Sequence, residues 1–300
     1  MFLPLLKLAR PKQWAKSAFV LVGPLYALTD PKHTPGEVLP PALVTAVILA
    51  LVSSACYVVN DILDAPRDRL HPRKSRRPIA SGAVGPGVAW IYALVLIALG
   101  AAGLLLLRDE RALAWVAALT LTYALNTNLY SFYLKRKAIS DVICLSLGFV
   151  LRVLAGCAAA GVQPSTWLLN CTLFLAMFLS FGKRLGERKT MGPDAGAVRG
   201  VQLTYTDDLL RTAVSVTGVA TLITYAGYIQ FRDAARFWVN PLWFTMLPAT
   251  YGLLRCIVLL ERGQYDDPTE IAARDWAIQV AALVFGAITV GAVLASGAGH

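Results

Sequence analysis

Long apolar stretches recur from one end of the chain to the other, separated by short clusters of charged residues, prolines and glycines. A helix needs about 20 mostly apolar residues to cross a bilayer, and these stretches have that length. The pattern therefore predicts an all-α, polytopic membrane protein with nine transmembrane helices. The expected spans cover residues 13–29, 40–62, 86–107, 111–133, 139–160, 164–182, 209–230, 237–260 and 274–297.

Composition supports a membrane protein. Hydrophobic residues make up 57% of the 300 residues and charged residues only 15%, whereas soluble domains carry about 25% charged residues. The mean hydropathy is +0.58. Because the apolar stretches run through the whole chain, one membrane domain over residues 1–300 is expected, without a separate soluble module.

The net charge of +10 is unevenly distributed. If nine spans alternate across the bilayer, most lysines and arginines fall on one side, in the N-terminus and in loops 63–85, 134–138, 183–211 and 255–274. The exceptions are Lys32, Arg108, Arg111, Arg232 and Arg236 on the other side and Arg152 inside a span. Positive residues favour the cytoplasm, which predicts a multi-pass plasma-membrane protein with a cytoplasmic N-terminus and an outer C-terminus. This bias accounts for the charge, so no nucleic-acid partner is expected.

Acidic residues gather where the second predicted span ends, at Asn60, Asp61, Asp64 and Asp68. Positions three and four apart share one helical face, so these side chains would converge if the helix continues past Pro66. Alternatively, Pro66 ends or kinks the helix and Asp68 comes from the next turn. Oxygen-only ligands favour Mg²⁺, so the four residues are candidate metal ligands. The competing interpretation is a solvated helix end with ion pairs to nearby arginines.

A dense basic segment, residues 69–82, follows the acidic cluster. Lysines and arginines beside Mg²⁺ suit a polyanion, above all a diphosphate. Lys74 and Arg77 are therefore candidates for substrate binding. The alternative for these cations is membrane topology and contact with lipid headgroups.

Residues 60–68 read NDxxDxxxD and are followed by Arg77-Pro78-Ile79-Ala80-Ser81-Gly82. This pair of motifs resembles the first signature of the UbiA superfamily of intramembrane prenyltransferases, and the spans and loops extend the resemblance over nearly the whole chain. It implies a helical bundle around a cavity open to lipid and to the cytoplasmic side. It also implies Mg²⁺-bound diphosphate at the cytoplasmic mouth, with Asp61, Asp64 and Asp68 as the catalytic carboxylates.

The loop after the sixth predicted span departs from the common family pattern. Typical members carry a second aspartate-rich motif there, whereas residues 182–189 are mainly basic and Asp207 and Asp208 do not form a DxxxD repeat. A basic loop suits a monophosphate better than a second metal ion. This departure resembles the prenyl-phosphate phosphoribosyltransferase branch of the superfamily. Further segments resemble the same branch: Arg10 to Lys16, His71 to Lys74, and Tyr130 to Asp141.

The branch implies transfer of a phosphoribosyl group from phosphoribosyl diphosphate to a long polyprenyl (decaprenyl) phosphate, for arabinan synthesis in the bacterial cell wall. The enzymatic alternative is a prenyltransferase that moves a prenyl chain from its diphosphate to an aromatic acceptor. A transporter or anion channel is disfavoured, because the sequence shows no inverted repeats with broken mid-membrane helices. The sequence leaves open the prenyl length and whether copies of the chain form a homo-oligomer.

Other polar residues near the cytoplasmic ends of the spans are also candidates for substrate binding. Lys16 and Lys135 suit phosphate contacts, although snorkelling or positive-inside anchoring explains them equally well. Asp141 lies just inside a span, where acids are functional candidates or complement the helix dipole. Arg152 lies about 16 Å further along the same helix, either as a polar anchor or as a substrate contact. The substrate-binding candidates are Lys16, Asn60, Lys74, Arg77, Tyr130, Lys135, Asp141, Lys183, Arg184 and Tyr205.

Overall fold

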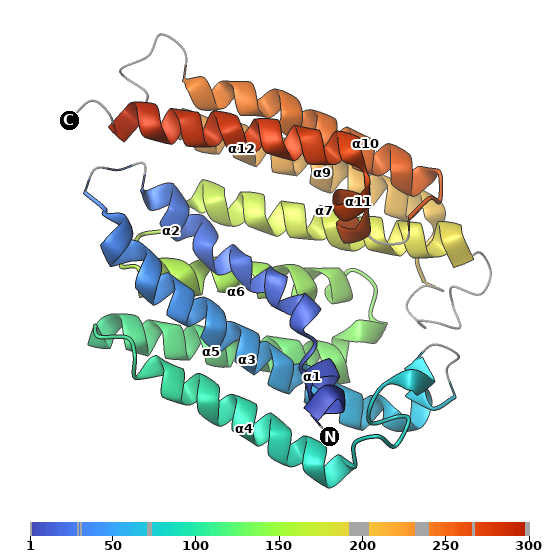
Figure 1. Cartoon of the computed structure of the whole chain (residues 1–300). Helices are drawn as coiled ribbons and strands as arrows, with labels where there is room; N and C mark the ends of the chain where they lie inside the picture. The colour runs from blue at the N-terminus through green and yellow to red at the C-terminus, as the bar shows by residue number, and fades with distance from the viewer. Residues whose placement is uncertain are drawn as a thin grey trace. The chain divides into compact units, whose positions relative to one another are not determined.

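The structure is a computed structural model that describes residues 2–28, 30, 32–70, 74–191, 204–231, 240–265 and 268–297. All regular structure in these residues is helical, which confirms the predicted fold class (Figure 1). The elements are α1 (Phe2–Ala9), η1 (Pro11–Leu21), α2 (Val22–Ala27), α3 (Pro35–Asp68), η2 (Lys74–Arg76), α4 (Pro86–Leu104), α5 (Glu110–Phe132), η3 (Leu134–Arg136), α6 (Ser140–Ala159), α7 (Thr166–Met191), α9 (Asp207–Phe231), η6 (Pro241–Thr245), α10 (Met246–Glu261), α11 (Pro268–Arg274) and α12 (Trp276–Gly297).

Among the described residues, six helical stretches are long and apolar enough to cross a membrane: Pro35–Asp68, Pro86–Leu104, Ser140–Ala159, Thr166–Lys189, Asp207–Gln230 and Pro241–Glu261. The other three predicted spans are also helical. Residues 13–29 fall on η1 and α2, residues 111–133 correspond to α5, and residues 274–297 to α12 with a shorter apolar stretch, Trp276–Ala292. The count of nine is thus approximate. Arg232, Arg236, residues 237–239 and His300 lie outside the described residues.

Helix α3 is longer than the predicted span 40–62 at both ends. It begins with a capping box formed by Thr34 and Glu37, which satisfies backbone N–H groups that have no partner within the helix. Its other end continues through Pro66, and the N–H of Arg69 still donates to the carbonyl oxygen of Ala65 at 3.1 Å. A proline removes its own N–H from the helical ladder and crowds the carbonyl group four residues before it, and α3 accommodates both effects at Pro66. The acidic residues up to Asp68 therefore lie on one continuous helix.

The helices pack as two compact units, and α6 is divided between them after Val150. The first unit contains α1, η1, α2 to α5 and the later part of α6. Within it, α4 and η1 pack along α3 (Figure 1). Helix α6 approaches η1 so closely that a Cβ atom added to Gly156 would overlap the carbonyl oxygen of Val20.

The second unit contains the start of α6 and the helices α7 to α12. Helix α7 lies along α9, and α10 lies along α12 (Figure 1). Its core includes Phe178 and Leu185 of α7, Leu210 of α9 and Leu259 of α10, all buried. Each unit has a core of its own, and the single domain over residues 1–300 stays a prediction.

Candidate functional site

The acidic end of α3 forms a cluster of paired charges in the first unit. The residues Asp61 and Asp68 are only 3% and 4% exposed. Nη1 of Arg77 donates to Oδ1 of Asp61 at 3.0 Å and to Oδ2 of Asp68 at 2.8 Å. One nitrogen thus joins two carboxylates that lie seven positions apart, which is possible because the helix stays regular through Pro66.

Arg10 is a second cation in this cluster, and the sequence did not single it out. Its Nη2 donates to Oδ1 of Asp61 at 2.5 Å, and its guanidinium lies 5.0 Å from the centre of the Tyr57 ring. Arg10 joins α1 to η1 in a left-handed conformation, with φ of 52°. The only signal for it was its place at the start of the basic Arg10–Lys16 segment, directly before Pro11.

The N-terminal segment that carries Arg10 is anchored on α3. The indole N–H of Trp14 donates to the Ser54 hydroxyl at 3.0 Å, and that hydroxyl lies 2.8 Å from the carbonyl oxygen of Ala9. Ser54 is buried and lies two turns before Asp61 on the same helix. These bonds fix the chain on either side of Arg10 against the helix that provides its carboxylate partner.

Ion pairs with nearby arginines are the alternative to a metal site that the sequence leaves open, and such ion pairs are present at the end of α3. The described residues contain no group of three or more His, Cys, Asp or Glu side chains close enough to share a metal ion. The donor set still fits Mg²⁺. Two carboxylates already converge on one cationic nitrogen, and Asp64 lies between them on the same face of α3. Oxygen donors of this kind suit Mg²⁺, and the four-residue ligand set stays a prediction.

The remaining candidates of the first unit are partly buried and lie on three elements. Lys16 lies on η1, Lys74 on η2, and Tyr130 two residues before the end of α5. Lys16 and Lys74 both make polar or electrostatic contacts in the structure. Residues 71–73, which belong to the basic part of the first motif, lie outside the described residues.

Three candidates of the second unit contact one another in a buried network. Asp141 is completely buried, and its Oδ2 accepts hydrogen bonds from Nε and Nη2 of Arg184 at 3.1 and 3.0 Å. The Tyr205 hydroxyl donates to Oδ1 of Asp141 at 2.6 Å. Burial and this hydrogen bond raise the pKa of Tyr205 above its ordinary value, so the hydroxyl keeps its proton and remains a donor. Glu187 lies 3.6 Å from Nη1 of Arg184.

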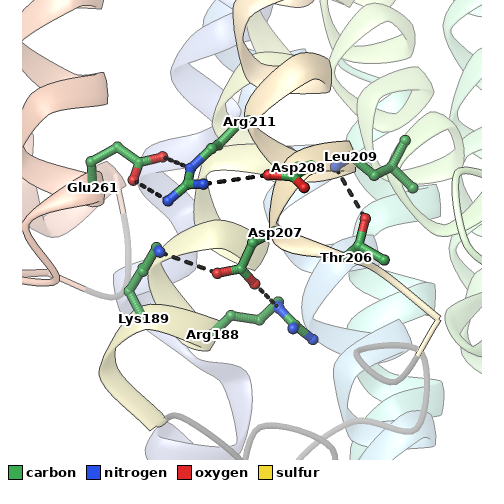
Figure 2. A network of polar contacts seen from close by, with 8 residues as sticks. All are labelled: Arg188, Lys189, Thr206, Asp207, Asp208, Leu209, Arg211 and Glu261. Atoms are coloured by element: carbon green, nitrogen blue, oxygen red, sulfur yellow. Dashed lines mark hydrogen bonds and ion pairs between the residues drawn. The ribbon is translucent and has the colours of Figure 1, made fainter.

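The sequence predicted a span over residues 164–182 followed by a basic loop. The structure corrects this end, because the residues that follow 182 are helical. Helix α7 continues to Met191, and its last turn carries Arg188 and Lys189. Nε of Arg188 and Nζ of Lys189 bond to the carboxylate of Asp207 at 2.7 and 3.1 Å (Figure 2). Cations at a helix C-terminus and acids at a helix N-terminus each complement the helix dipole. This pairing therefore joins α7 to the start of α9.

A second set of ion pairs joins α9 to α10. Arg211 binds both carboxylate oxygens of Glu261, at 2.9 and 3.2 Å, and lies 3.4 Å from Asp208 (Figure 2). Asp207 and Asp208 thus both pair with cations. Acids therefore balance four cations of this region, which are Arg184, Arg188, Lys189 and Arg211.

Arg152 lies in a buried polar cluster of the first unit. Its Nη2 donates to the hydroxyl of Tyr123 at 2.7 Å and to that of Ser53 at 3.2 Å. Its guanidinium also lies 4.4 Å from the centre of the Tyr123 ring. Its partners are supplied by α3 and α5, as expected of a polar anchor.

Comparison with known proteins places this arrangement in a family. Residues 17–278 match the UbiA prenyltransferase family. The chain belongs to the UbiA family. The acidic end of α3 lies inside the matched residues, whereas Arg10 and Lys16 precede them.

Members of the UbiA family with similar sequences cover nearly the whole chain. A protein from Mycobacterium tuberculosis named decaprenyl-phosphate phosphoribosyltransferase is 34% identical over 294 residues, which is 97% of this chain and 94% of the relative. A protein of the same name from Corynebacterium glutamicum is 33% identical over 285 residues, with 94% and 84% covered. A UbiA homolog from Archaeoglobus fulgidus, solved bound to GPP and Mg²⁺, shares the fold. Its TM-score is 0.63 at 18% identity, with 98% of both chains covered.

Proposed function

We propose that this chain transfers a 5-phosphoribosyl group from phosphoribosyl diphosphate to a long-chain polyprenyl (decaprenyl) phosphate, depends on Mg²⁺ and releases diphosphate. The observation that carries the proposal is the cluster of two buried carboxylates and two arginines at the end of α3. The names of the relatives at 33–34% identity support the substrate pair. The product would serve cell-wall arabinan synthesis.

The cluster carries both charges that a metal-bound diphosphate requires. Asn60, Asp61, Asp64 and Asp68 would hold Mg²⁺, which when bound would neutralise charge on the leaving diphosphate. The guanidinium of Arg77 is a planar donor suited to phosphate oxygens. Arg10 offers a second guanidinium beside the same carboxylate. If the carboxylates held a metal ion, both arginines would be available to the diphosphate.

The reaction breaks the bond between the anomeric carbon of ribose and the diphosphate oxygen, and the electron pair leaves with the diphosphate. Positive charge develops on the anomeric carbon, as in glycosyl transfer generally. An oxygen of the lipid phosphate then forms the new bond to that carbon. This oxygen is already anionic, so no side chain has to remove a proton. The residues of the chain contribute positioning and electrostatic stabilisation.

Cations away from α3 would hold the remaining phosphates, which are the 5-phosphate of the sugar and the phosphate of the lipid. Their mutual repulsion is strong where the dielectric constant is low. Lys16, Lys74, Lys135 and Lys183 are the proposed contacts, with Tyr130 as a hydroxyl donor. By the positive-inside bias, these groups lie at the cytoplasmic face of the plasma membrane.

A prenyltransferase that uses a prenyl diphosphate and an aromatic acceptor is the alternative within the family. A second metal site would favour it, and the described part of the 183–211 segment argues against such a site. Asp207 is held by Arg188 and Lys189, and Asp208 lies beside Arg211 (Figure 2). These two carboxylates are adjacent in the chain, so unlike the acids of α3 they are not spaced three or four positions apart to share one helix face.

The proposal is tested by giving the purified chain each substrate pair in detergent with Mg²⁺. A lipid-soluble phosphoribosyl product from phosphoribosyl diphosphate and polyprenyl phosphate is expected. Product formed only from a prenyl diphosphate and an aromatic acid would overturn the donor assignment and leave family membership intact.

A further inference from the structure

Ile139 has a backbone conformation that its residue type rarely adopts. Its φ is +67°, and β-branched residues are strained in this left-handed region. Ile139 lies between η3, which carries Lys135, and the first residue of α6. Its side chain is 49% exposed, so side-chain packing accounts for little of what holds the backbone there.

Tyr205 is hydrogen-bonded to this strained backbone. The N–H of Ile139 donates to the Tyr205 hydroxyl at 2.7 Å, and the same hydroxyl donates to Asp141. Tyr205 is 1% exposed and packs edge-on against Phe181 of α7, while Arg184 of α7 fixes Asp141. The hydroxyl therefore links the turn before α6 to Asp141 and, through Asp141, to the buried Arg184.

The turn itself presents basic residues. Lys135 and Arg136 belong to η3, and Lys137 follows with its N–H bonded to the carbonyl oxygen of Leu134. The N–H of Asp141 in turn bonds to the carbonyl oxygen of Lys137 at 3.0 Å. A change of conformation at Ile139 would therefore move the whole turn relative to α6.

We infer that Tyr205 is a positioning residue whose hydroxyl holds the Leu134–Ile139 turn in its strained conformation, so that Lys135 is placed to bind a phosphate group of a substrate. The inference rests on the proposed function. It also assigns Asp141, Arg184 and Tyr205 to support of the turn rather than to contact with substrate.

The test removes the hydroxyl and then removes the strain. Tyr205→Phe keeps the buried ring and loses both hydrogen bonds. Ile139→Gly relieves the strain, because glycine adopts positive φ without steric cost. Tyr225→Phe is the matched control, since it loses a buried hydroxyl bonded to Thr245 at 2.7 Å in the same unit but away from the turn. The KM for each substrate, kcat, and hydrogen exchange over residues 134–143 are measured for all variants.

Tyr205→Phe is expected to raise the KM of one substrate about tenfold, with little change in kcat. This is the typical effect of losing a hydrogen bond to a charged group, here the contact between Lys135 and the phosphate. Exchange over residues 134–143 should increase. The substrate whose KM changes identifies the phosphate that Lys135 binds. Adding Ile139→Gly should restore both readouts, and Tyr225→Phe should change neither.

Unchanged KM and exchange in Tyr205→Phe would overturn the inference, as would a raised KM that Ile139→Gly fails to restore. If Tyr205→Phe does not fold, the double variant should fold, and its failure would also overturn the inference. A wild-type chain without phosphoribosyl transfer would refute the proposed function, whereas the exchange measurement would still decide the role of Tyr205.

Discussion

Asp61 and Asp68 show how single charged residues at the end of α3 are stabilised. A buried carboxylate without a partner costs several kcal/mol, and Arg77 bonds to both of these carboxylates. The arginines therefore stabilise the acidic cluster. Mg²⁺ would compete with them for the carboxylates, while a diphosphate would bind the arginines that Mg²⁺ displaces. Metal and diphosphate are thus expected to bind more tightly together than separately.

Asp64→Asn is expected to lower the transfer rate by about 100-fold or more, a loss typical of removing one electrostatic contact to a transition state. Asparagine keeps the size of the side chain and removes its charge. Asp64 is only partly buried, so folding should persist. Initial rates at saturating Mg²⁺ and gel filtration check both points. Asp208→Asn, at a side chain 94% exposed, is the control, and wild-type turnover by Asp64→Asn would exclude this residue from the metal site.

Residue types and spacing were enough to single out Asp61, Asp68 and Arg77, which pair with one another in the structure, because the residues lie close together in sequence. They were not enough to find Arg10, whose partner Asp61 is 51 positions away. The partners of Arg152 lie 29 and 99 positions away. A pattern along the chain shows which residues share a helix face, but it does not show which distant side chain meets that face.

Helix α7 illustrates the same limit at the level of elements. The charges between Lys183 and Lys189 predicted a loop, because charged residues rarely continue a membrane span. The structure extends the helix to Met191, since Asp141 and Asp207 from other elements balance Arg184, Arg188 and Lys189. Pro66 in α3 was left open for a similar reason: the sequence alone does not fix whether a helix tolerates one missing N–H.

Gly156→Ala is expected to disturb the packing of α6 against η1. The added methyl group would overlap the carbonyl oxygen of Val20, and overpacking of this kind costs about 1–3 kcal/mol or more. Thermal unfolding in detergent should show a lower Tm. Gly252→Ala in α10, where a Cβ meets nothing within 4 Å, is the matched control and should leave Tm unchanged or raise it. Equal Tm values for both variants would contradict the close approach of α6 and η1.

Asp207 and Asp208 at the start of α9 provide a test of the interpretation that the chain has a single metal site, at the acidic end of α3. The double variant Asp207→Asn, Asp208→Asn is expected to keep the transfer rate within about threefold, because surface ion pairs contribute only about 0–1 kcal/mol. A chain with a second metal site at these residues would instead lose most of its activity. Initial rates at several Mg²⁺ concentrations distinguish the two outcomes.

The sequence was most informative about the whole chain, where it predicted the positions of the helices. Each of the nine predicted spans overlaps a helix of the structure, because a backbone in lipid must satisfy its own hydrogen bonds and helices do so within one segment. Composition and length thus predict membrane helices well. They do not predict how the helices group, and the boundary between the two compact units inside α6 had no signal in the sequence.

Removal of metal is expected to abolish transfer by the intact protein. Treatment with EDTA should reduce product to background, and added Mg²⁺ should restore it, because the diphosphate would otherwise leave without charge neutralisation. The folded state should survive, since Arg10 and Arg77 pair with the carboxylates. Gel filtration before and after EDTA checks this point, and full activity in a metal-free preparation would contradict the mechanism.

The donor is tested most directly by following two labels in one reaction. Purified chain is given polyprenyl phosphate, Mg²⁺ and phosphoribosyl diphosphate that carries one label in the ribose and another in the terminal phosphate. The account predicts that the ribose label enters the lipid fraction while the phosphate label appears as free diphosphate in equal amount, and that Asp64→Asn stops both. Ribose label that stays in the aqueous fraction while the same preparation joins a prenyl diphosphate to an aromatic acid would contradict it.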